Sequence, residues 1–424
     1  MVVVYLLLFF VFLFMGVPIA ISLGAAGSLW LISQPGIPNM LLATKIFAGT
    51  DSFAMMAIPF FMLAGQFMEH TGITQKIVDF AKSLVGHIPG GLAHTACVSG
   101  MIMAGISGSG NADTAAIGNI MLPALTADGY DEGFAVSVMA SSGALGPIIP
   151  PSVFMIIFAN CANYSVGKMF MGGMIPGVIM GLGFMVICYV YAKRHHIGGG
   201  KFLGLKNVWK QTLSAIGALI MPVIIVGGIT TGVFTATEAG VIASVYGFFY
   251  GLFTRSIDFK LLKESLLNAV LASVGPMMII TYSSIYAYML ARMNVSALLG
   301  EYCLAHIHSE AAFLIFIVII ATIAGCFIDA IATLYILLPV FTPVVKALGV
   351  DFQHFAVVFS MGLLTCQITP PVGSLLYVAA GIRNTPIKKI IKHIWPFIII
   401  MIIVIMLSIF IPEIVCWLPA LIYG

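Results

Sequence analysis

Two aspartates stand within long apolar stretches of the sequence. Asp113 closes the segment Ser107-Gly-Ser-Gly-Asn-Ala-Asp113, and Asp329 separates the apolar segments 311–328 and 330–345. A charged side chain inside a bilayer costs at least about 2.5–3.5 kcal/mol, so each carboxylate predicts a compensating cation or a set of hydrogen-bond donors. Aspartate is also a favoured helix N-cap, and both residues precede a helical run. Ion binding and capping are therefore two compatible roles for them.

Oxygen-bearing and small residues surround both aspartates. Hydroxyl, amide and carbonyl oxygens are hard ligands that suit Na⁺ better than a soft transition metal. Glycine lets backbone carbonyls approach closely, although an isolated glycine is more typical of plain helix packing. The residues predicted to bind sodium or substrate are, in the first half, Ser107, Gly108, Ser109, Asn111, Asp113, Ser142, Gly143, Gly146 and Pro147, and in the second half Gly325, Asp329, Thr333, Gln367, Thr369, Pro370, Gly373 and Ser374.

A third polar interruption runs from Thr230 to Glu238. Its residues Thr231, Thr235 and Glu238 could line a transport pathway. The same pattern, with threonine and glutamate ahead of Ala-Gly, also suits the end of one helix and the capped start of the next. The residues themselves favour neither interpretation.

The composition places the chain in a lipid environment. It has 424 residues, of which 61% are hydrophobic and 8% charged, with a mean hydropathy of +1.12. Soluble domains carry roughly 25% charged residues, so this chain cannot cover a water-facing surface. A membrane span needs about 20 apolar residues. Uncharged runs of that length occur at 1–44, 83–112, 133–167, 169–192, 211–237, 265–291, 352–382 and 393–412.

Several classes of protein are excluded. The net charge of +3 is too small to indicate nucleic-acid binding, and the seven cysteines form no CxxC pair or regular spacing. No phosphate-binding GxxxxGK[ST] loop is present, and the connecting segments are too short for a fused ATPase. The first apolar run continues past Pro18 towards Ser33, which predicts one retained helix rather than a cleaved signal peptide.

Two re-entrant hairpins and two broken helices are expected. About 14 uncharged residues separate Asp113 from Asp128, too few at 1.5 Å each to cross a ~30 Å core, and Asp329 likewise divides two half-length segments. Both regions predict hairpins. Pro-Pro in 140–152 and again in 366–374 must unwind the spans that contain them. Unwound backbone at membrane depth lies buried in protein or lines an aqueous cavity.

These features form a repeat. Each aspartate is followed ten residues later by a proline, and the double proline comes 27 residues later in the first half and 31 in the second. The segments 193–210 and 383–392 carry five and four Lys or Arg, which predicts that both are cytoplasmic. One helix, at about 166–192, lies between the first broken helix and its basic segment, and none lies between the second broken helix and its basic segment. The two broken helices are therefore predicted to run in opposite directions. Lys346, in a loop placed outside, opposes this topology. Paired interrupted segments are the strongest sequence indication of a transporter binding site.

Four motifs carry a family resemblance over essentially the whole chain. Ser107-Gly-Ser-Gly-Asn-Ala-Asp-Thr-Ala-Ala116, Pro147-Ile-Ile-Pro-Pro-Ser152, Gly232-Val-Phe-Thr-Ala-Thr-Glu-Ala239 and Ile368-Thr-Pro-Pro-Val-Gly373 occur in that order. They resemble signatures of the large membrane subunit of tripartite ATP-independent periplasmic (TRAP) transporters, the DctM-like family of the ion-transporter superfamily. The chain departs from the family pattern at Gly110-Asn111, at Ala236 and at Cys366-Gln367. Gln367 is therefore a candidate contact peculiar to a subgroup.

The resemblance implies a transporter rather than an enzyme, with an all-α membrane fold and an elevator mechanism. It implies Na⁺ as the coupling ion, with no other metal or cofactor, and a multi-pass location in the bacterial inner membrane. The implied partners are a small four-helix membrane subunit and a periplasmic binding protein. That protein would deliver an organic acid: a C4-dicarboxylate, sialic acid (N-acetylneuraminate), or a related sugar or keto acid. An anion could be held by half-helix N-termini and bound Na⁺.

The expected division assigns residues 1–82 and 166–305 to a scaffold, and 83–165 and 306–383 to the two transport repeats. Residues 384–424 would form an interfacial segment and a membrane helix, and Ile73–Val85 an interfacial amphipathic helix. The nearest alternative is a Na⁺/dicarboxylate carrier that needs no binding protein. A channel is a further rival. An intramembrane aspartyl protease fits poorly, because Pro123-Ala-Leu125 precedes the second aspartate.

Overall fold

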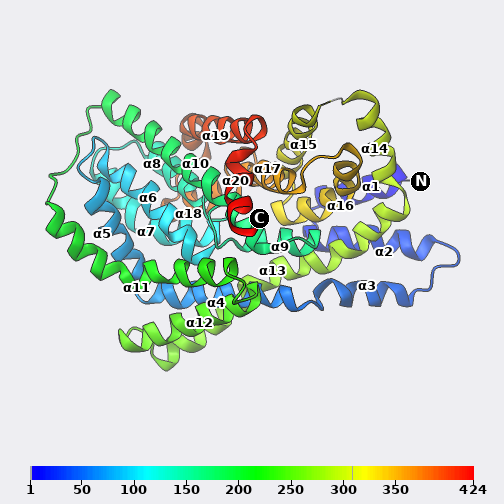
Figure 1. The fold of residues 1–424 in the computed structure, drawn as a ribbon, viewed down its shortest axis with the longest axis horizontal. Helices are drawn as coiled ribbons and strands as arrows, with labels where there is room; N and C mark the ends of the chain where they lie inside the picture. The colour runs from blue at the N-terminus through cyan, green and yellow to red at the C-terminus, as the bar shows by residue number, and fades with distance from the viewer. Residues whose placement is uncertain (1, 308) are drawn as a thin grey trace.

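All regular structure in the computed structural model, which describes residues 2–307 and 309–424, is helical. The chain folds into many packed helices with short connections (Figure 1). The α-helices are α1 Val2–Phe14, α2 Ile19–Ser33, α3 Met40–Thr50, α4 Ala57–His70, α5 Ile73–Val85, α6 Gly91–Ser107, α7 Gly110–Ala127, α8 Glu132–Gly143, α9 Val153–Ala162, α10 Val166–Arg194, α11 Leu205–Thr230, α12 Ala236–Phe253, α13 Phe259–Arg292, α14 Val295–His306, α15 Glu310–Gly325, α16 Ala330–Leu348, α17 Phe352–Thr365, α18 Ser374–Arg383, α19 Ile387–Phe410 and α20 Glu413–Tyr423; the 3₁₀ turns are η1 Phe53–Met56 and η2 Cys366–Ile368.

Six of the described helices are long and apolar enough to cross a membrane. They are α10, α11, α12, α13, α16 and α19, and α3 with η1–α4 makes a seventh if this pair, bent by 51°, counts as one span. The remaining apolar helices are short because the chain folds back or unwinds beside them. The chain is therefore a multi-pass membrane protein built largely from half-length helices.

The first apolar run is not one helix, and this part of the sequence interpretation was wrong. α1 ends at Phe14, Gly16 adopts a left-handed conformation with φ of 82°, and α2 begins after Pro18. Proline favours an extended residue before it, and glycine accepts positive φ without strain, so the two together turn the chain. Phe9 of α1 then packs against Tyr286 of α13.

The first predicted hairpin and broken helix are confirmed. α6 and α7 pack side by side, joined only by Gly108 and Ser109, and both contact α8. α8 stops at Gly143, and the chain continues without regular helix to Ser152, where α9 starts. Ser152 caps α9 by accepting a hydrogen bond from the Met155 backbone N–H at 3.1 Å.

The second hairpin and broken helix have the same order of elements. α15 and α16 are joined by residues 326–329 and both contact α17, which passes through η2 and an irregular segment before α18. By length and composition alone α16 would qualify as a span. Its N-terminus nevertheless lies at the hairpin tip beside the central cavity described below, so it forms one arm of a hairpin.

The contacts of α19 confirm that the two repeats are inverted. At the start of α19, Lys389 pairs with Glu132 at the start of α8, with an N–O distance of 3.2 Å. Near the other end of α19, the Ser408 carbonyl lies 2.8 Å from His354 Nε2 at the start of α17. Because α19 is one continuous helix, α8 and α17 begin at opposite ends of the molecule.

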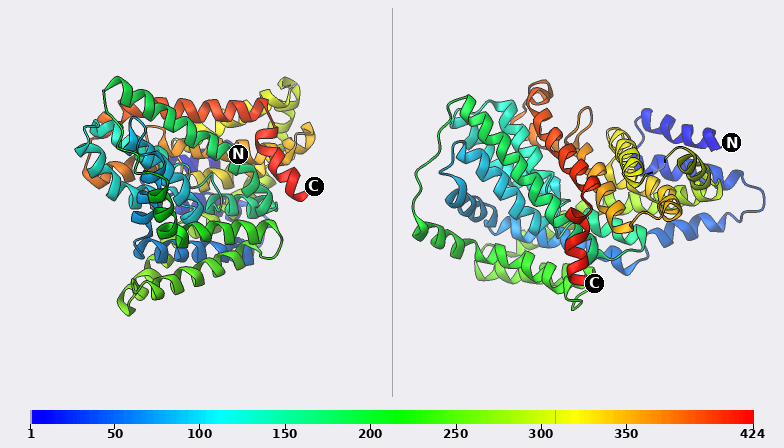
Figure 2. Two further views of the ribbon diagram at one scale, coloured as in Figure 1. Left: turned by 60° about the vertical axis from the view of Figure 1, so that its left-hand side comes forward. Right: turned by 45° about the horizontal axis from the view of Figure 1, so that its top comes forward.

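The helices form two layers (Figures 1 and 2). α3, α4, α11, α12 and α13 lie along one side, and the hairpins and broken helices lie along the other. α4 packs closely on α12 and α13. α10, which the sequence division placed with the scaffold, packs mainly on α6, α9, α17, α19 and α20. α20 is a second, short helix in the C-terminal segment.

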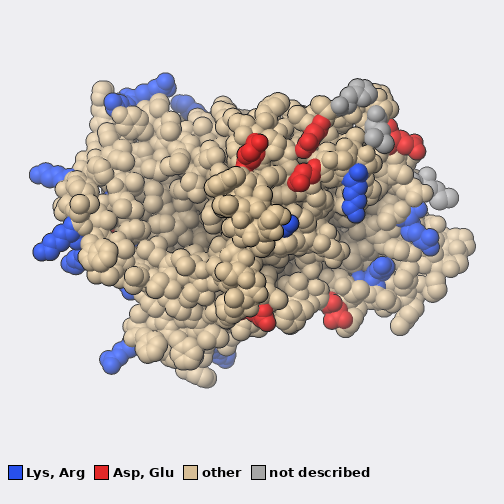
Figure 3. All heavy atoms as spheres, in the orientation of Figure 1, with Lys and Arg blue, Asp and Glu red and all other residues tan. Residues whose placement is uncertain are grey.

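Basic residues gather at one end of the visible face (Figure 3). At the left end of the visible face, over α5 and the α10–α11 connection, every coloured side chain is Lys or Arg, whereas Asp and Glu lie in the middle and right (Figure 3). Both basic connectors lie at this end, because the Tyr191 and His393 rings approach to 6.2 Å. α5 has the predicted bounds and buries Ile73, Ile77 and Val78.

Candidate functional site

The tip of the first hairpin holds its aspartate fully buried. Ser107, the last residue of α6, donates from Oγ to Asp113 Oδ1 at 2.6 Å and accepts from the Ser109 N–H at 3.0 Å. Gly108 turns the chain with φ of 60°, and an added Cβ there would collide with the Pro151 carbonyl. Glycine is therefore required for α6, α7 and the broken helix to meet at this point.

Two buried oxygens on neighbouring residues at this tip have no hydrogen-bond partner among the described residues. They are Asp113 Oδ2 and Thr114 Oγ1. An unpartnered buried polar atom is costly, and a buried carboxylate oxygen especially so. A Cβ at Gly146 would lie 2.7 Å from Asp113 Oδ2, so α7 and the broken helix meet at these oxygens. Such a set of hard oxygen donors fits a small hard cation.

The other predicted residues of the first repeat lie in the same region. Gly108, Ser109, Asn111 and Pro147 line a central cavity together with Ser107 and Asp113. Ser142 is buried and donates to the Val138 carbonyl at 2.7 Å, within its own helix. A Cβ at Gly143 would overlap Thr114 Oγ1, so Gly143 permits close packing without lining the cavity.

In the second repeat, Asp329 is a helix cap at the cavity wall. Its Oδ1 accepts a hydrogen bond from the Ile331 N–H at 2.9 Å, and its side chain is exposed. Asp329 therefore caps α16 as predicted, a role that is compatible with ion binding. Thr333 donates to the Asp329 carbonyl at 2.9 Å and is buried within α16. Gly325 packs against Cys366, where an added Cβ would lie 2.6 Å from the sulfur.

Of the second broken helix, only Gln367 lines the cavity. Thr369 donates to the Thr365 carbonyl at 2.8 Å, and the Gly373 N–H donates to the Thr369 carbonyl at 3.1 Å. Ser374 is exposed, and Pro370 is partly buried. The two interrupted segments therefore differ: the first is enclosed by protein over residues 144–152, and the second reaches the surface.

A cavity of about 520 Å³ lies where both hairpin tips meet α4 and α13. Gly110, Val153 and Ala330, which begin the half-helices α7, α9 and α16, all line it. The N-terminus of a helix carries partial positive charge, so three such ends favour an anion in the cavity. The lining contains no Lys or Arg among the described residues, but it includes three carboxylates, Glu69, Asp113 and Asp329.

The far wall of the cavity was not predicted from the sequence. Phe61, Gln66 and Glu69 of α4 line it, with Gly275 and Pro276 of α13. One feature of the sequence could have indicated this polar face. Gln66 and Glu69 are three residues apart and so lie on one face of a mostly apolar helix. Nothing in the sequence indicated that this face would oppose Asp113.

The third polar interruption lies elsewhere. Thr235 and Glu238 form a reciprocal capping box at the start of α12, in which the Thr235 N–H donates to Glu238 Oε2 at 2.7 Å. Thr231 donates to the Gly227 carbonyl at 2.8 Å. None of the three lines the cavity. Their observed contacts are those of helix termini.

Comparison with known proteins agrees with this architecture. The sequence model of the family "Tripartite ATP-independent periplasmic transporter, DctM component" matches residues 6–414. The chain is 35% identical over 408 residues to the isethionate TRAP transporter permease protein DctMQ of Oleidesulfovibrio alaskensis, covering 96% of this chain and 64% of that one. It is 34% identical to the C4-dicarboxylate TRAP transporter large permease protein DctM of Pseudomonas aeruginosa, with 94% and 93% covered.

A third relative is the 2,3-diketo-L-gulonate TRAP transporter large permease protein YiaN of Escherichia coli, 32% identical with 94% of each chain covered. Among solved structures, the Alcanivorax borkumensis YdaH transporter superposes with a TM-score of 0.64 at 13% identity, covering 87% of each chain. At that identity the structural likeness establishes the fold alone. The relatives are transporter permeases rather than enzymes. From the family match over nearly its whole length, the chain belongs to the DctM component family of the tripartite ATP-independent periplasmic transporters.

Proposed function

We propose that this chain is the large permease subunit of a Na⁺-coupled secondary transporter that imports an organic acid through the inner membrane. The observation that carries the proposal is the cavity between the two hairpin tips and the α4–α13 wall, with the buried Asp113 at its edge. Isethionate, C4-dicarboxylate and diketogulonate in the relatives' names are all organic acids. The substrate proposed here is therefore a small organic anion.

The charge of the cavity supports the proposal of sodium coupling. An anion has to enter a site whose own charged groups are Glu69, Asp113 and Asp329, with no lysine or arginine among its described lining residues. A cation at Asp113 Oδ2 and the neighbouring hydroxyls would neutralise that carboxylate and attract the substrate. Na⁺ and substrate then bind cooperatively, because each reduces the electrostatic cost of the other.

An elevator movement would carry this site across the membrane. The hairpins and broken helices would move as one body against α4, α12 and α13. Small residues lie at that boundary: an added Cβ at Gly275 of α13 meets no atom within 4 Å, and one at Gly65 of α4 meets only Ser107. At these two positions no bulky side chain opposes a shift of the hairpin tips along α4 and α13. The proposed partners are a small membrane subunit beside these helices and a periplasmic binding protein that delivers the acid.

The test is reconstitution of this chain with its small subunit and binding protein in liposomes. Uptake of labelled organic acids is compared under an inward Na⁺ gradient and an inward K⁺ gradient. We expect uptake only with Na⁺, and a loss of at least tenfold in Asp113→Asn. Asp128→Asn is the matched control, because Asp128 is exposed at the other end of α7.

Equal uptake in K⁺, or an unchanged Asp113→Asn, would contradict the sodium site. Uptake that proceeds at full rate without the binding protein would instead support a stand-alone Na⁺/dicarboxylate carrier. Uptake that fails to saturate with substrate would indicate a channel.

A further inference from the structure

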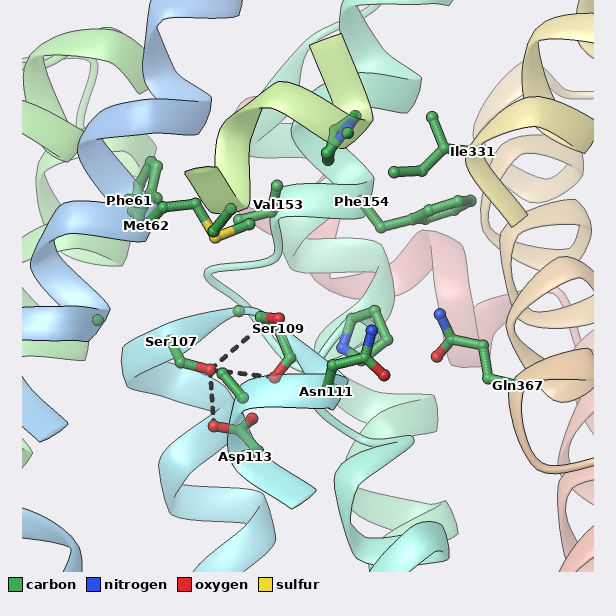
Figure 4. A pocket seen from close by; sticks show the side chains of 18 of the residues that line it. Phe61, Met62, Ser107, Ser109, Asn111, Asp113, Val153, Phe154, Ile331 and Gln367 are labelled. Atoms are coloured by element: carbon green, nitrogen blue, oxygen red, sulfur yellow. Dashed lines mark hydrogen bonds between the residues drawn. The ribbon is translucent and has the colours of Figure 1, made fainter. Parts of the chain in front are cut away.

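Two amide side chains from opposite repeats face each other across the cavity. Asn111 comes from the tip of the first hairpin, and Gln367 from the second broken helix. Their amide ends are turned toward one another (Figure 4). Only the tertiary structure brings them together, since 255 residues separate them in the sequence. Two of the three departures from the family pattern noted in the sequence thus fall on one site.

The amide oxygen of Gln367 has no hydrogen-bond donor among the described residues. This oxygen, Oε1, is buried. Gln353 offers the contrast: its Oε1 accepts from Tyr164 at 2.9 Å and its Nε2 donates to the Lys168 carbonyl at 3.1 Å. A buried acceptor without a donor costs roughly 1–3 kcal/mol. A ligand that donates a hydrogen bond at Gln367 would remove that cost.

The charges and dipoles of the cavity indicate which part of a substrate could donate a hydrogen bond to Gln367. An ionised carboxylate or sulfonate only accepts hydrogen bonds, so the anionic end of a substrate cannot satisfy Gln367 Oε1. The anionic end belongs beside the helix N-termini at Gly110 and Val153. Apolar side chains such as Phe154 and Ile331 complete the wall near the amides. A hydroxyl or an N–H of the substrate would satisfy this oxygen, and so would Na⁺, for which an amide oxygen is also a ligand. The Na⁺ proposed above is assigned to Asp113 Oδ2, which leaves the substrate as the donor at Gln367.

We infer that Asn111 and Gln367 form a specificity site that recognises a hydroxyl or amide N–H on the substrate, so that the transported acid carries such a group rather than being unsubstituted. The inference rests on the proposed transport function and refines its substrate class. Gln367 accepts from the substrate donor, and the Asn111 amide, which is exposed to the cavity, bonds the same polar group from the other side. A site built around such hydrogen bonds rejects analogues that lack the group.

The experiment compares acids that differ by one hydroxyl. Liposomes that contain the complete transporter are assayed under a Na⁺ gradient with two pairs, L-malate and succinate, and L-lactate and propionate. We expect the wild type to favour the hydroxylated member of at least one pair by about tenfold or more in kcat/KM. In Gln367→Leu and Asn111→Ala that ratio should fall towards one, because the change removes the bond to the hydroxyl. Uptake of the deoxy acid should fall by less than uptake of the hydroxylated acid in both variants.

The kcat/KM ratio of hydroxylated to deoxy acid is compared between the wild type and each variant. The same binding protein is present in every sample, so its own substrate preference cancels and a change in the ratio reports on Asn111 or Gln367. Gln353→Leu is the matched control for a glutamine whose amide is already bonded within the protein, and it should lower uptake of both members equally. An unchanged hydroxyl preference in Gln367→Leu, or an equal loss of both acids, would overturn the inference. No Na⁺-driven uptake of any acid by the wild type would instead reject the proposed function itself.

Discussion

At the residue scale, two aspartates with the same sequence context have different structural roles. Asp113 is fully buried, with one oxygen bonded by Ser107 and the other without a partner among the described residues. Asp329 uses one oxygen to cap α16, and its side chain is exposed. The unpartnered oxygen of Asp113 predicts a role for its charge, whereas the observed bond of Asp329 is one that a neutral cap could also make.

Substitutions of Asp329 separate capping from charge. Asparagine is as good an N-cap as aspartate, whereas alanine caps poorly and costs about 0.5–2 kcal/mol. We expect Asp329→Asn to retain the thermal stability of the wild type and Asp329→Ala to unfold at lower temperature in detergent. The two variants are compared by thermal melting and by Na⁺-driven uptake. A severe loss of uptake in a stable Asp329→Asn would show that its charge also takes part in transport.

At the element scale, glycine decides how closely the first broken helix approaches α7. Gly143 and Gly146 lie where any larger side chain would meet Thr114 or Asp113. The unwound segment can therefore lie against the N-terminal turn of α7 and keep its backbone buried. The second interrupted segment lacks this enclosure, because Pro371 and Val372 are exposed. The repeat therefore preserves the order of elements but not their burial.

Adding one methyl group at Gly146 tests this close packing. Overpacking of a buried site costs about 1–3 kcal/mol, and here the new Cβ would also press on Asp113 Oδ2. We expect Gly146→Ala to lower the melting temperature and to raise the Na⁺ concentration that supports half-maximal uptake. Gly381→Ala, in α18, is the matched control, since its Cβ would meet no atom within 4 Å. Equal behaviour of the two variants would contradict the account.

At the scale of the whole molecule, the cavity lies at the boundary between two groups of helices. One wall comes from the hairpin tips and broken helices, and the other from α4 and α13. Under the elevator proposal, movement of one group of helices against the other would let substrate enter or leave the cavity. The elevator proposal therefore predicts that joining the two walls stops transport.

A cross-link between Gly65 of α4 and Ser107 of α6 tests the movement. A Cβ at Gly65 would lie 3.8 Å from the Ser107 Cβ, a separation that suits a disulfide. Because Ser107 also bonds Asp113, uptake is compared with that of the reduced double variant. We expect oxidation of the Gly65→Cys, Ser107→Cys double variant to abolish this remaining uptake and reduction to restore it. Each single variant and the wild type, treated with the same oxidant, control for the seven native cysteines. Full uptake by a completely cross-linked double variant would exclude sliding at this boundary.

The sequence by itself determined the elements. Charges inside apolar runs, double prolines and run lengths located both hairpins, both broken helices and α5, because each signal acts on the backbone nearby. The basic connectors also gave the inverted arrangement, which the contacts of α19 confirm. The predicted N-terminal helix was wrong, because its apolar residues hid a break at Gly16.

Only the tertiary structure decided which polar residues meet. It placed Asn111 opposite Gln367, brought Gln66 and Glu69 into the cavity wall, and left Thr235 and Glu238 as a helix cap. It also gave Asp113 and Asp329 their different burial. The physical reason is that helix formation depends on neighbours in the chain, whereas convergence of side chains depends on the packing of segments far apart, which periodicity and composition do not encode.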